Sequence, residues 1–218
     1  MNDNVKSRQF VGLKNDFQTL SENVIQQLSF VEGLLQTGYK QAVYEEVINN
    51  NKNACLLTKK IRVDFVNSML LFSPRAVELR QLVTCQDATN YLEAIGKLLV
   101  DGVILLKAID LELPDFDYFN VTLSKMFSRA KGMVGDAVFA FCYEDSSVAH
   151  KIISEGVALN EVVETATLTF QDLPLSVQEL KNITGISNLS YIFEKICNIA
   201  VNIAAASVYL IEGKYIKV

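Results

Sequence analysis

The chain has 218 residues, half of them apolar, and a formal net charge of −5. That length and apolar content are enough for one large hydrophobic core or two modest ones. The acidic balance argues against nucleic-acid binding, which would need a basic face for the phosphates. It favours a soluble protein that contacts other proteins.

Apolar residues recur at three- and four-residue spacing along most of the chain, and only three prolines interrupt it. This pattern predicts an all-α protein. We expect a first amphipathic helix from Phe10 to Gly38 and a second from about Lys40 to Leu71. Ser73-Pro74 resembles an N-cap followed by proline at the first helical position, so a third helix should run from there to about Asp110.

A break around Pro114 divides the chain near its middle, and the same helical pattern then repeats. Helices are expected over 118–143 and 146–170, and a last one from Pro174 to Glu212. Gly213 is a natural stop for that helix. The last helix is apolar over most of its circumference and carries Glu194 near its centre.

The two halves are also related in sequence, because adding 101 to a position in the third helix gives its counterpart in the last helix. Glu78-Leu79-Arg80 corresponds to Glu179-Leu180-Lys181, and Leu92-Glu93 corresponds to Phe193-Glu194. A repeat of about a hundred residues is too long for a solenoid unit. We therefore predict a duplicated three-helix bundle, with residues 1–112 and 113–218 forming two bundles that pack together.

The N-terminus is polar and lacks the apolar centre of a signal peptide, and the most apolar run, 98–109, contains Asp101 and Lys107. That run is shorter than the roughly 18 uncharged residues of a membrane span. We expect a cytoplasmic protein with reduced cysteines. Cys85 and Cys197 are expected in the core, and His150, the single histidine, on the surface.

The motifs on the two long third helices resemble those of the PhoU family of phosphate-uptake regulators. Glu93-Ala-Ile-Gly96-Lys97 and Glu194-Lys-Ile-Cys197-Asn198 occupy the places of the family's Glu-Arg-Ile-Gly-Asp. Glu78-Leu79-Arg80 resembles the family's Asp-Leu-Arg, and the end of the last helix, Tyr209 to Lys214, resembles the family's Tyr-Leu-Val-Glu-Gly-Lys. The resemblance covers nearly the whole chain and implies a PhoU-like six-helix fold.

The resemblance also implies a metal surface, because the family's Glu-x-x-x-Asp places two carboxylates on one helix face. Acids of the second helices complete a surface that holds iron or zinc clusters in some members. In this chain Lys97 and Asn198 replace the two motif aspartates, and Asn51, Cys55, Gly156 and Asn160 stand at the usually acidic positions of the second helices. We therefore expect no metal cofactor, although the resemblance leaves an iron or zinc cluster open.

The main hypothesis about this site concerns Lys97. Glu followed by Lys four residues later is a favourable helical ion pair, so Lys97 is expected to replace the missing metal charge beside Glu93. The alternative is a solvated pair that contributes about 0.3–0.5 kcal/mol. In the second half, Glu194 and Asn198 remain, with Asn160, Glu161 and Glu164 as weaker candidates for a single cation.

The sequence contains no phosphate-binding glycine loop and no catalytic triad pattern, so we expect no enzyme. The resemblance implies a negative regulator of phosphate homeostasis that contacts a phosphate transporter ATPase, a phosphate-sensing histidine kinase, or both. It also implies a homodimer, with membrane association only through partners. The alternative is a metal-free PhoU-like scaffold or transporter accessory protein without a role in phosphate signalling.

Overall fold

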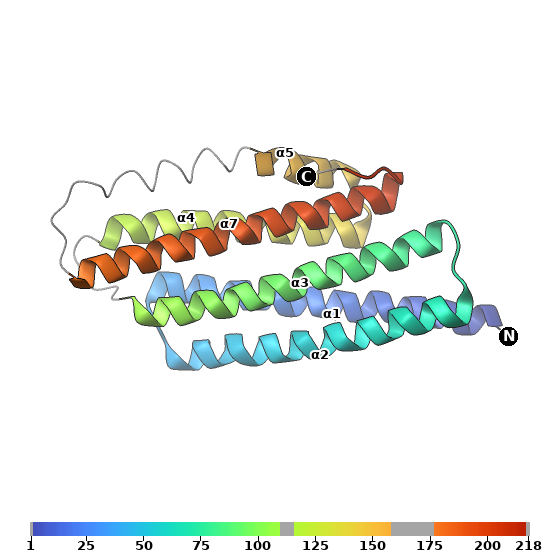
Figure 1. Ribbon diagram of the computed structural model, residues 1–218, viewed down its shortest axis with the longest axis horizontal. Helices are drawn as coiled ribbons and strands as arrows, with labels where there is room; N and C mark the ends of the chain where they lie inside the picture. Colours follow the sequence, from blue (N-terminus) through green and yellow to red (C-terminus); the bar gives the residue numbers. More distant parts are fainter. Residues whose placement is uncertain (1, 110–115, 158–176, 217–218) are drawn as a thin grey trace.

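The computed structural model describes residues 2–109, 116–157 and 177–216 (Figure 1). Within these ranges the chain forms six helices and no strand: α1 (Asn2–Thr37), α2 (Gln41–Phe72), α3 (Val77–Ala108), α4 (Phe116–Tyr143), α5 (Ser146–Val157) and α7 (Val177–Glu212). The predicted all-α fold is confirmed.

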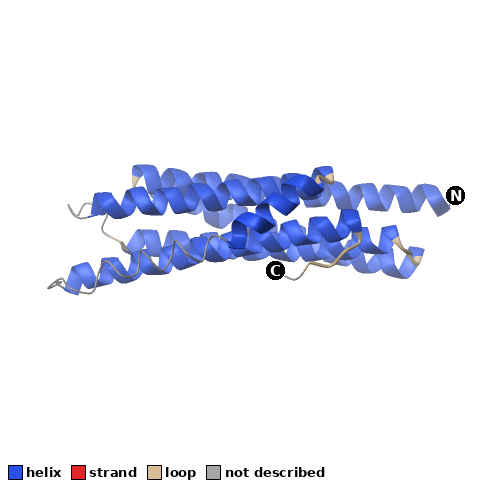
Figure 2. Ribbon diagram, turned by 90° about the horizontal axis from the view of Figure 1, so that it is seen from above, coloured by secondary structure: helices blue, strands red, loops and turns tan. Residues whose placement is uncertain are grey.

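The helices are arranged as two three-helix bundles lying side by side. Helices α1, α2 and α3 form one bundle, and α4, α5 and α7 form the other. Between the bundles, α3 packs along α7 and α1 packs along α4. Figure 1 shows α4, α5 and α7 above α1, α2 and α3, so in the view from above the one bundle lies over the other (Figure 2). The predicted boundary between residues 112 and 113 lies outside the described residues, so the domain limits stay a prediction.

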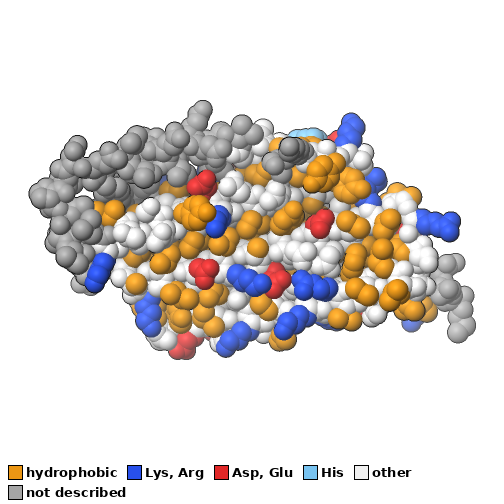
Figure 3. Space-filling view, in the orientation of Figure 1, with side chains coloured by type: hydrophobic (Ala, Val, Ile, Leu, Met, Phe, Trp, Pro, Cys, Tyr) orange, Lys and Arg blue, Asp and Glu red, His pale blue; other side chains and the backbone are white. Residues whose placement is uncertain are grey.

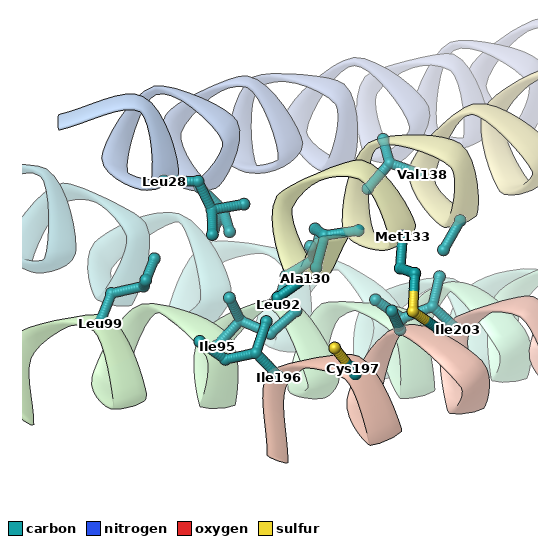
Figure 4. Close-up of a cluster of buried hydrophobic side chains, with 14 of the residues drawn as sticks. Leu28, Leu92, Ile95, Leu99, Ala130, Met133, Val138, Ile196, Cys197 and Ile203 are labelled. Atoms are coloured by element: carbon teal, nitrogen blue, oxygen red, sulfur yellow. The ribbon is translucent and has the colours of Figure 1, made fainter. Parts of the chain in front are cut away.

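The hydrophobic core continues from one bundle into the other (Figure 4). Leu28 of α1 and Ile95 of α3 are fully buried, and so is Ile196 of α7. Gly102 of α3 lies against Leu189 and Ile192 of α7, as expected for antiparallel helices whose crossing is near Ile95 and Ile196. The two repeat-related helices therefore form the centre of the molecule.

Two predicted helix stops are confirmed at glycines. Gly38 follows α1 with φ +78°, and Gly213 follows α7 with φ +71°. A left-handed backbone strains any residue with a side chain, so glycine is favoured at both positions.

The predicted N-cap at Ser73 is wrong. Ser73 has left-handed dihedrals, φ 44° and ψ 57°, and ends α2 instead. Pro74 is buried in the connection, and α3 begins at Val77 after Ala76, which provides no side-chain cap. Because Ser73 already closes one helix, the next one starts three residues later than the Ser-Pro pattern suggests.

Other helix limits differ less from expectation. Helix α1 begins at Asn2, earlier than the predicted Phe10, and Lys6 near its start pairs with Glu78 of α3 at 2.6 Å. Helix α5 begins at Ser146 as predicted, and Asp145 Oδ1 accepts hydrogen bonds from the backbone N–H groups of Ser147 and Val148. The predicted end of this helix at Phe170 and the start of the last helix at Pro174 lie outside the described residues.

Among the described helices, α7 has the length and hydropathy of a membrane span over Lys181–Glu212. It packs against α3, α4 and α5, and the side chains of Leu189, Ile196 and Ile203 are fully buried within the protein. Because α7 is a core helix that contacts both bundles, its apolar composition is explained by packing within the protein.

Candidate functional site

The motif glutamate of the first bundle, Glu93, lies on α3 with its side chain only 20% exposed. Lys97, one turn further along α3, places its Nζ 2.8 Å from Glu93 Oε1. Arg62 of α2 approaches the other carboxylate oxygen, with 3.8 Å between Nη2 and Oε2. The carboxylate therefore lies between two cations that come from different helices.

These contacts favour the charged forms of the groups involved. The hydrogen bond to Glu93 raises the pKa of Lys97 above its ordinary value. Arg62 is also held by Asn90, whose Oδ1 accepts a hydrogen bond from Nη2 at 3.2 Å. On this face of the molecule, acidic and basic side chains alternate along the middle (Figure 3).

Directly beneath the motif, two amide side chains converge on Gly96. Gln27 of α1 is fully buried and its Nε2 donates to the carbonyl oxygens of Val47 and Gly96, both at 3.2 Å. A Cβ at Gly96 would lie 2.8 Å from Asn51 Oδ1 and 3.3 Å from Gln27 Oε1, so a larger residue would require the Asn51 side chain to shift. Gln27 therefore ties all three helices of the bundle together at the level of the motif.

The two amide oxygens at Gly96 are buried and have no hydrogen-bond partner. The oxygen and nitrogen of an amide are assigned from its hydrogen bonds. Both amide side chains lie close to the Gly96 backbone, and each has a buried oxygen that accepts no hydrogen bond within the described residues. A neutral amide, Asn51, occupies this position, where the resemblance implies an acid.

The residues of this site do not fit an iron or zinc cluster. A cluster of cations needs several carboxylates to balance its charge, and here a single carboxylate already faces Lys97 and Arg62. Cys55 of α2, at another usually acidic position, is close enough to Lys97 to influence its pKa. Within the described residues, no group of three or more potential ligands comes together.

The second motif site differs from the first. Glu194 is half-buried on α7, while Asn198 is exposed. Among the described residues Glu194 has no ion pair, in contrast to Glu93. Burial raises the pKa of Cys197, and the nearby Arg129 of α4 opposes that rise. The Arg129 guanidinium donates a hydrogen bond to the Glu155 carbonyl oxygen at 3.3 Å. The candidates Asn160, Glu161 and Glu164 lie outside the described residues, so their role stays a prediction.

Helices α5 and α7 approach closely at Gly156. A Cβ at this position would overlap the Cγ2 methyl of Val201. Valine is branched at Cβ and cannot easily turn away. An acidic side chain therefore has no room at this position, where the family usually carries one, and apolar packing occupies the space.

The remaining predicted residues have structural roles. Burial raises the pKa of the Cys85 thiol to about 12 and that of Cys197 to about 11, which keeps both protonated at neutral pH. His150 is half-exposed and its Nε2 lies 2.9 Å from Glu212 Oε1, joining the start of α5 to the end of α7.

Sequence reasoning missed Arg62 and Gln27. Neither residue belongs to a motif, and each reaches the site from another helix. The only available signal was that both are polar residues on helices with a strong apolar pattern, which does not distinguish an inward from an outward position.

This geometry defines a class of protein: a tandem pair of three-helix bundles whose third helices pack antiparallel and each carry a motif glutamate. No protein-family model matches the chain. The chain is 28% identical, over 182 residues, to the phosphate-specific transport system accessory protein PhoU homolog of Aquifex aeolicus, and the match covers 79% of this chain and 78% of that protein.

Two solved structures have the same fold. PhoU from Pseudomonas aeruginosa superposes with a TM-score of 0.83 at 17% identity, covering 95% of this chain and 99% of that one. The phosphate transport system regulatory protein PhoU from Streptococcus pneumoniae superposes with a TM-score of 0.81 at 17% identity, covering 98% and 100%. The predicted resemblance to the PhoU family is confirmed by these similarities.

Proposed function

We propose that the chain is an accessory regulator of phosphate transport that acts by contact with a phosphate transporter ATPase, a phosphate-sensing histidine kinase, or both. The observation that carries this proposal is the sequence match to the Aquifex aeolicus accessory protein, which extends over most of both proteins. A match limited to one bundle would support only a shared fold.

The cysteines and the histidine that could serve as catalytic groups are consistent with a protein that acts by contact. Cys85 and Cys197 have raised pKa values and are unsuited to nucleophilic catalysis at neutral pH. The half-exposed His150 is paired with Glu212 where the start of α5 meets the end of α7. We accordingly propose a non-enzymatic, cytoplasmic protein that reaches the membrane only through its partners.

The experiment is deletion of the gene in its native host, followed by growth in phosphate-rich medium. We expect uptake of radiolabelled phosphate and transcripts of starvation genes to rise, and expression of the intact chain to restore both. Pairwise two-hybrid assays with the transporter ATPase and the histidine kinase then identify the contact. Unchanged uptake and transcripts in the deletion strain would reject this function.

A metal-free scaffold without a role in phosphate signalling is the second candidate. The Lys97–Glu93–Arg62 arrangement and the close approach at Gly156 favour it, because both replace the acidic surface of the family. A deletion strain with normal phosphate responses, together with retained binding to the transporter ATPase, would support the scaffold.

A further inference from the structure

A cavity of about 300 Å³ opens on the surface where α2 passes to α3. It is lined by Ala76, Val77, Leu79, Arg80 and Val83 of this connection and α3, together with Tyr209 near the end of α7. We call it the α3 entry pocket. Hydrophobic side chains gather at this end of the molecule, on the right of the space-filling view (Figure 3).

The apolar lining of the pocket is partly exposed to solvent. Val77 is 53% exposed, and Leu79 and Val83 are each 37% exposed. Single exposed apolar residues are normal on a protein surface, but here three of them border one hollow together with a charged group. The lining offers room for one large apolar side chain rather than for a whole cofactor.

Arg80 supplies the only charge among the lining residues. Its Nε is buried without a hydrogen-bond partner, and its Nη1 lies 2.5 Å from the point where a Cβ on Gly213 would be. The adjacent acid, Glu78, is already paired with Lys6 at 2.6 Å. In the described part of the chain, the Arg80 guanidinium therefore has no carboxylate opposite its charge.

Arginine keeps its charge under all ordinary conditions, and its planar group binds carboxylates through two parallel hydrogen bonds. A partly buried guanidinium without an anion is costly, and an incoming carboxylate removes that cost. The alternative is a purely structural role, because a cation near the C-terminus of α7 interacts favourably with the helix dipole. The two roles make different predictions for binding.

We propose that the α3 entry pocket binds a segment of a protein partner in which a carboxylate stands next to a large apolar side chain. The apolar side chain lies against Val77, Leu79 and Val83, and the carboxylate pairs with Arg80. Free inorganic phosphate is a poor match, because the lining offers a single cation, Arg80, to an anion that carries more than one negative charge. The proposal concerns this peptide chemistry and does not depend on the proposed role in phosphate transport.

The test selects peptides from a phage-displayed random library on the immobilised full chain. We expect the selected peptides to carry Asp or Glu beside Leu, Ile or Phe. Arg80→Gln should weaken their binding by about tenfold or more, which corresponds to ~1.4 kcal/mol. A peptide with Gln in place of its acid should lose binding to the same extent.

The repeat provides a matched control. Lys181 is the counterpart of Arg80 in the second half and is exposed, so Lys181→Gln removes the same charge without touching the pocket and should leave peptide binding unchanged. Val83→Glu is a second variant, because it places a carboxylate three residues from Arg80 on the same helix face. It should abolish peptide binding while the melting temperature stays the same or rises.

Three results would overturn the proposal. One is a selection without acidic–apolar peptides, and another is equal peptide affinity for the native chain and Arg80→Gln, especially if that variant also melts earlier, as a structural role predicts. The third is displacement of the peptides by inorganic phosphate at concentrations near those of the peptide, which would assign the pocket to a free anion. None of these results bears on phosphate uptake in the deletion strain.

Discussion

Glu32 of α1 and Lys131 of α4 form an ion pair that joins the two bundles, with 2.6 Å between Oε2 and Nζ. Ser128 donates to the other carboxylate oxygen at 3.1 Å. The hydrogen bond from Lys131 is the main reason that the pKa of Glu32 lies below its ordinary value. The pair adds a charged contact to an interface that is otherwise largely apolar.

Replacing Lys131 with Met should lower the free energy of unfolding at neutral pH by up to about 1 kcal/mol. Since the folded-state pKa of Glu32 is below its usual value of 4.5, the stabilisation is present above that pH and is lost as the pH falls through the folded-state pKa. The difference between the native chain and Lys131→Met should therefore shrink in acid. Urea unfolding at several pH values measures this.

Lys151→Met is the control for that measurement, because Lys151 pairs with Glu155 within α5 at 3.7 Å and both side chains are more exposed. Its effect should be smaller at every pH. A loss of stability for Lys131→Met that does not change with pH would contradict the proposed role of the Glu32 charge.

The close approach of α5 and α7 predicts that Gly156→Ala destabilises the fold. The added methyl group overlaps Val201, and overpacking of this kind costs about 1–3 kcal/mol. Gly135→Ala is a matched control, since a Cβ at Gly135 meets no atom within 4 Å. That change in a helix interior should stabilise the protein by up to about 1 kcal/mol. Chemical denaturation compares the two variants.

The steric cause can be tested separately. The variant that combines Gly156→Ala with Val201→Ala should lose less stability than the sum of the two single losses. The reason is that Val201→Ala removes the methyl group that the new Cβ would meet. If the double variant loses as much free energy of unfolding as the two single variants together, or more, the overlap is not the cause.

The donor set around Glu93 predicts that the purified chain contains no stoichiometric iron or zinc. Elemental analysis measures the metal directly, and addition of a chelator should leave the melting temperature unchanged. Lys97→Ala should lower stability by about 0.3–0.5 kcal/mol, as for other exposed helical pairs. Stoichiometric metal that disappears in Glu194→Ala would show instead that the second site still binds a cation.

The raised pKa values of Cys85 and Cys197 predict a large difference in reactivity between the folded and unfolded chain. With pKa values of about 12 for Cys85 and about 11 for Cys197, neither thiol forms much thiolate at neutral pH. Alkylation by iodoacetamide should be slow at both residues in the native chain and fast in denaturant, as read by peptide mass spectrometry. Fast native labelling of Cys197 would show that α7 opens locally.

Local rules predicted much of the fold and some of the site. The ends at Gly38 and Gly213 follow from the left-handed backbone that glycine tolerates, and the Glu93–Lys97 pair follows from helical spacing. Both features depend on residues close together in the chain, so a single sequence reveals them.

Features that depend on tertiary contacts were not predicted. The early start of α1 accompanies the contact of Lys6 with Glu78, 72 residues away. Ser73 takes a left-handed conformation in a connection where the neighbouring Pro74 is buried, and Ser-Pro statistics favour a different role. Arg62 and Arg80 reach their surroundings on other helices through tertiary packing, which periodicity along one helix does not describe.

The antiparallel contact between α3 and α7 has a consequence for how such a protein can change. Ile95 and Ile196 are fully buried where these helices cross, whereas Glu93 and Glu194 remain partly open to solvent. Lys97 and Asn198, which stand where the resemblance implies aspartates, are exposed and lie outside the crossing. Substitutions at such exposed positions therefore leave the packing of α3 on α7 intact. The charge and ligand properties of this surface can therefore change by substitution while the buried contact between α3 and α7 keeps the fold.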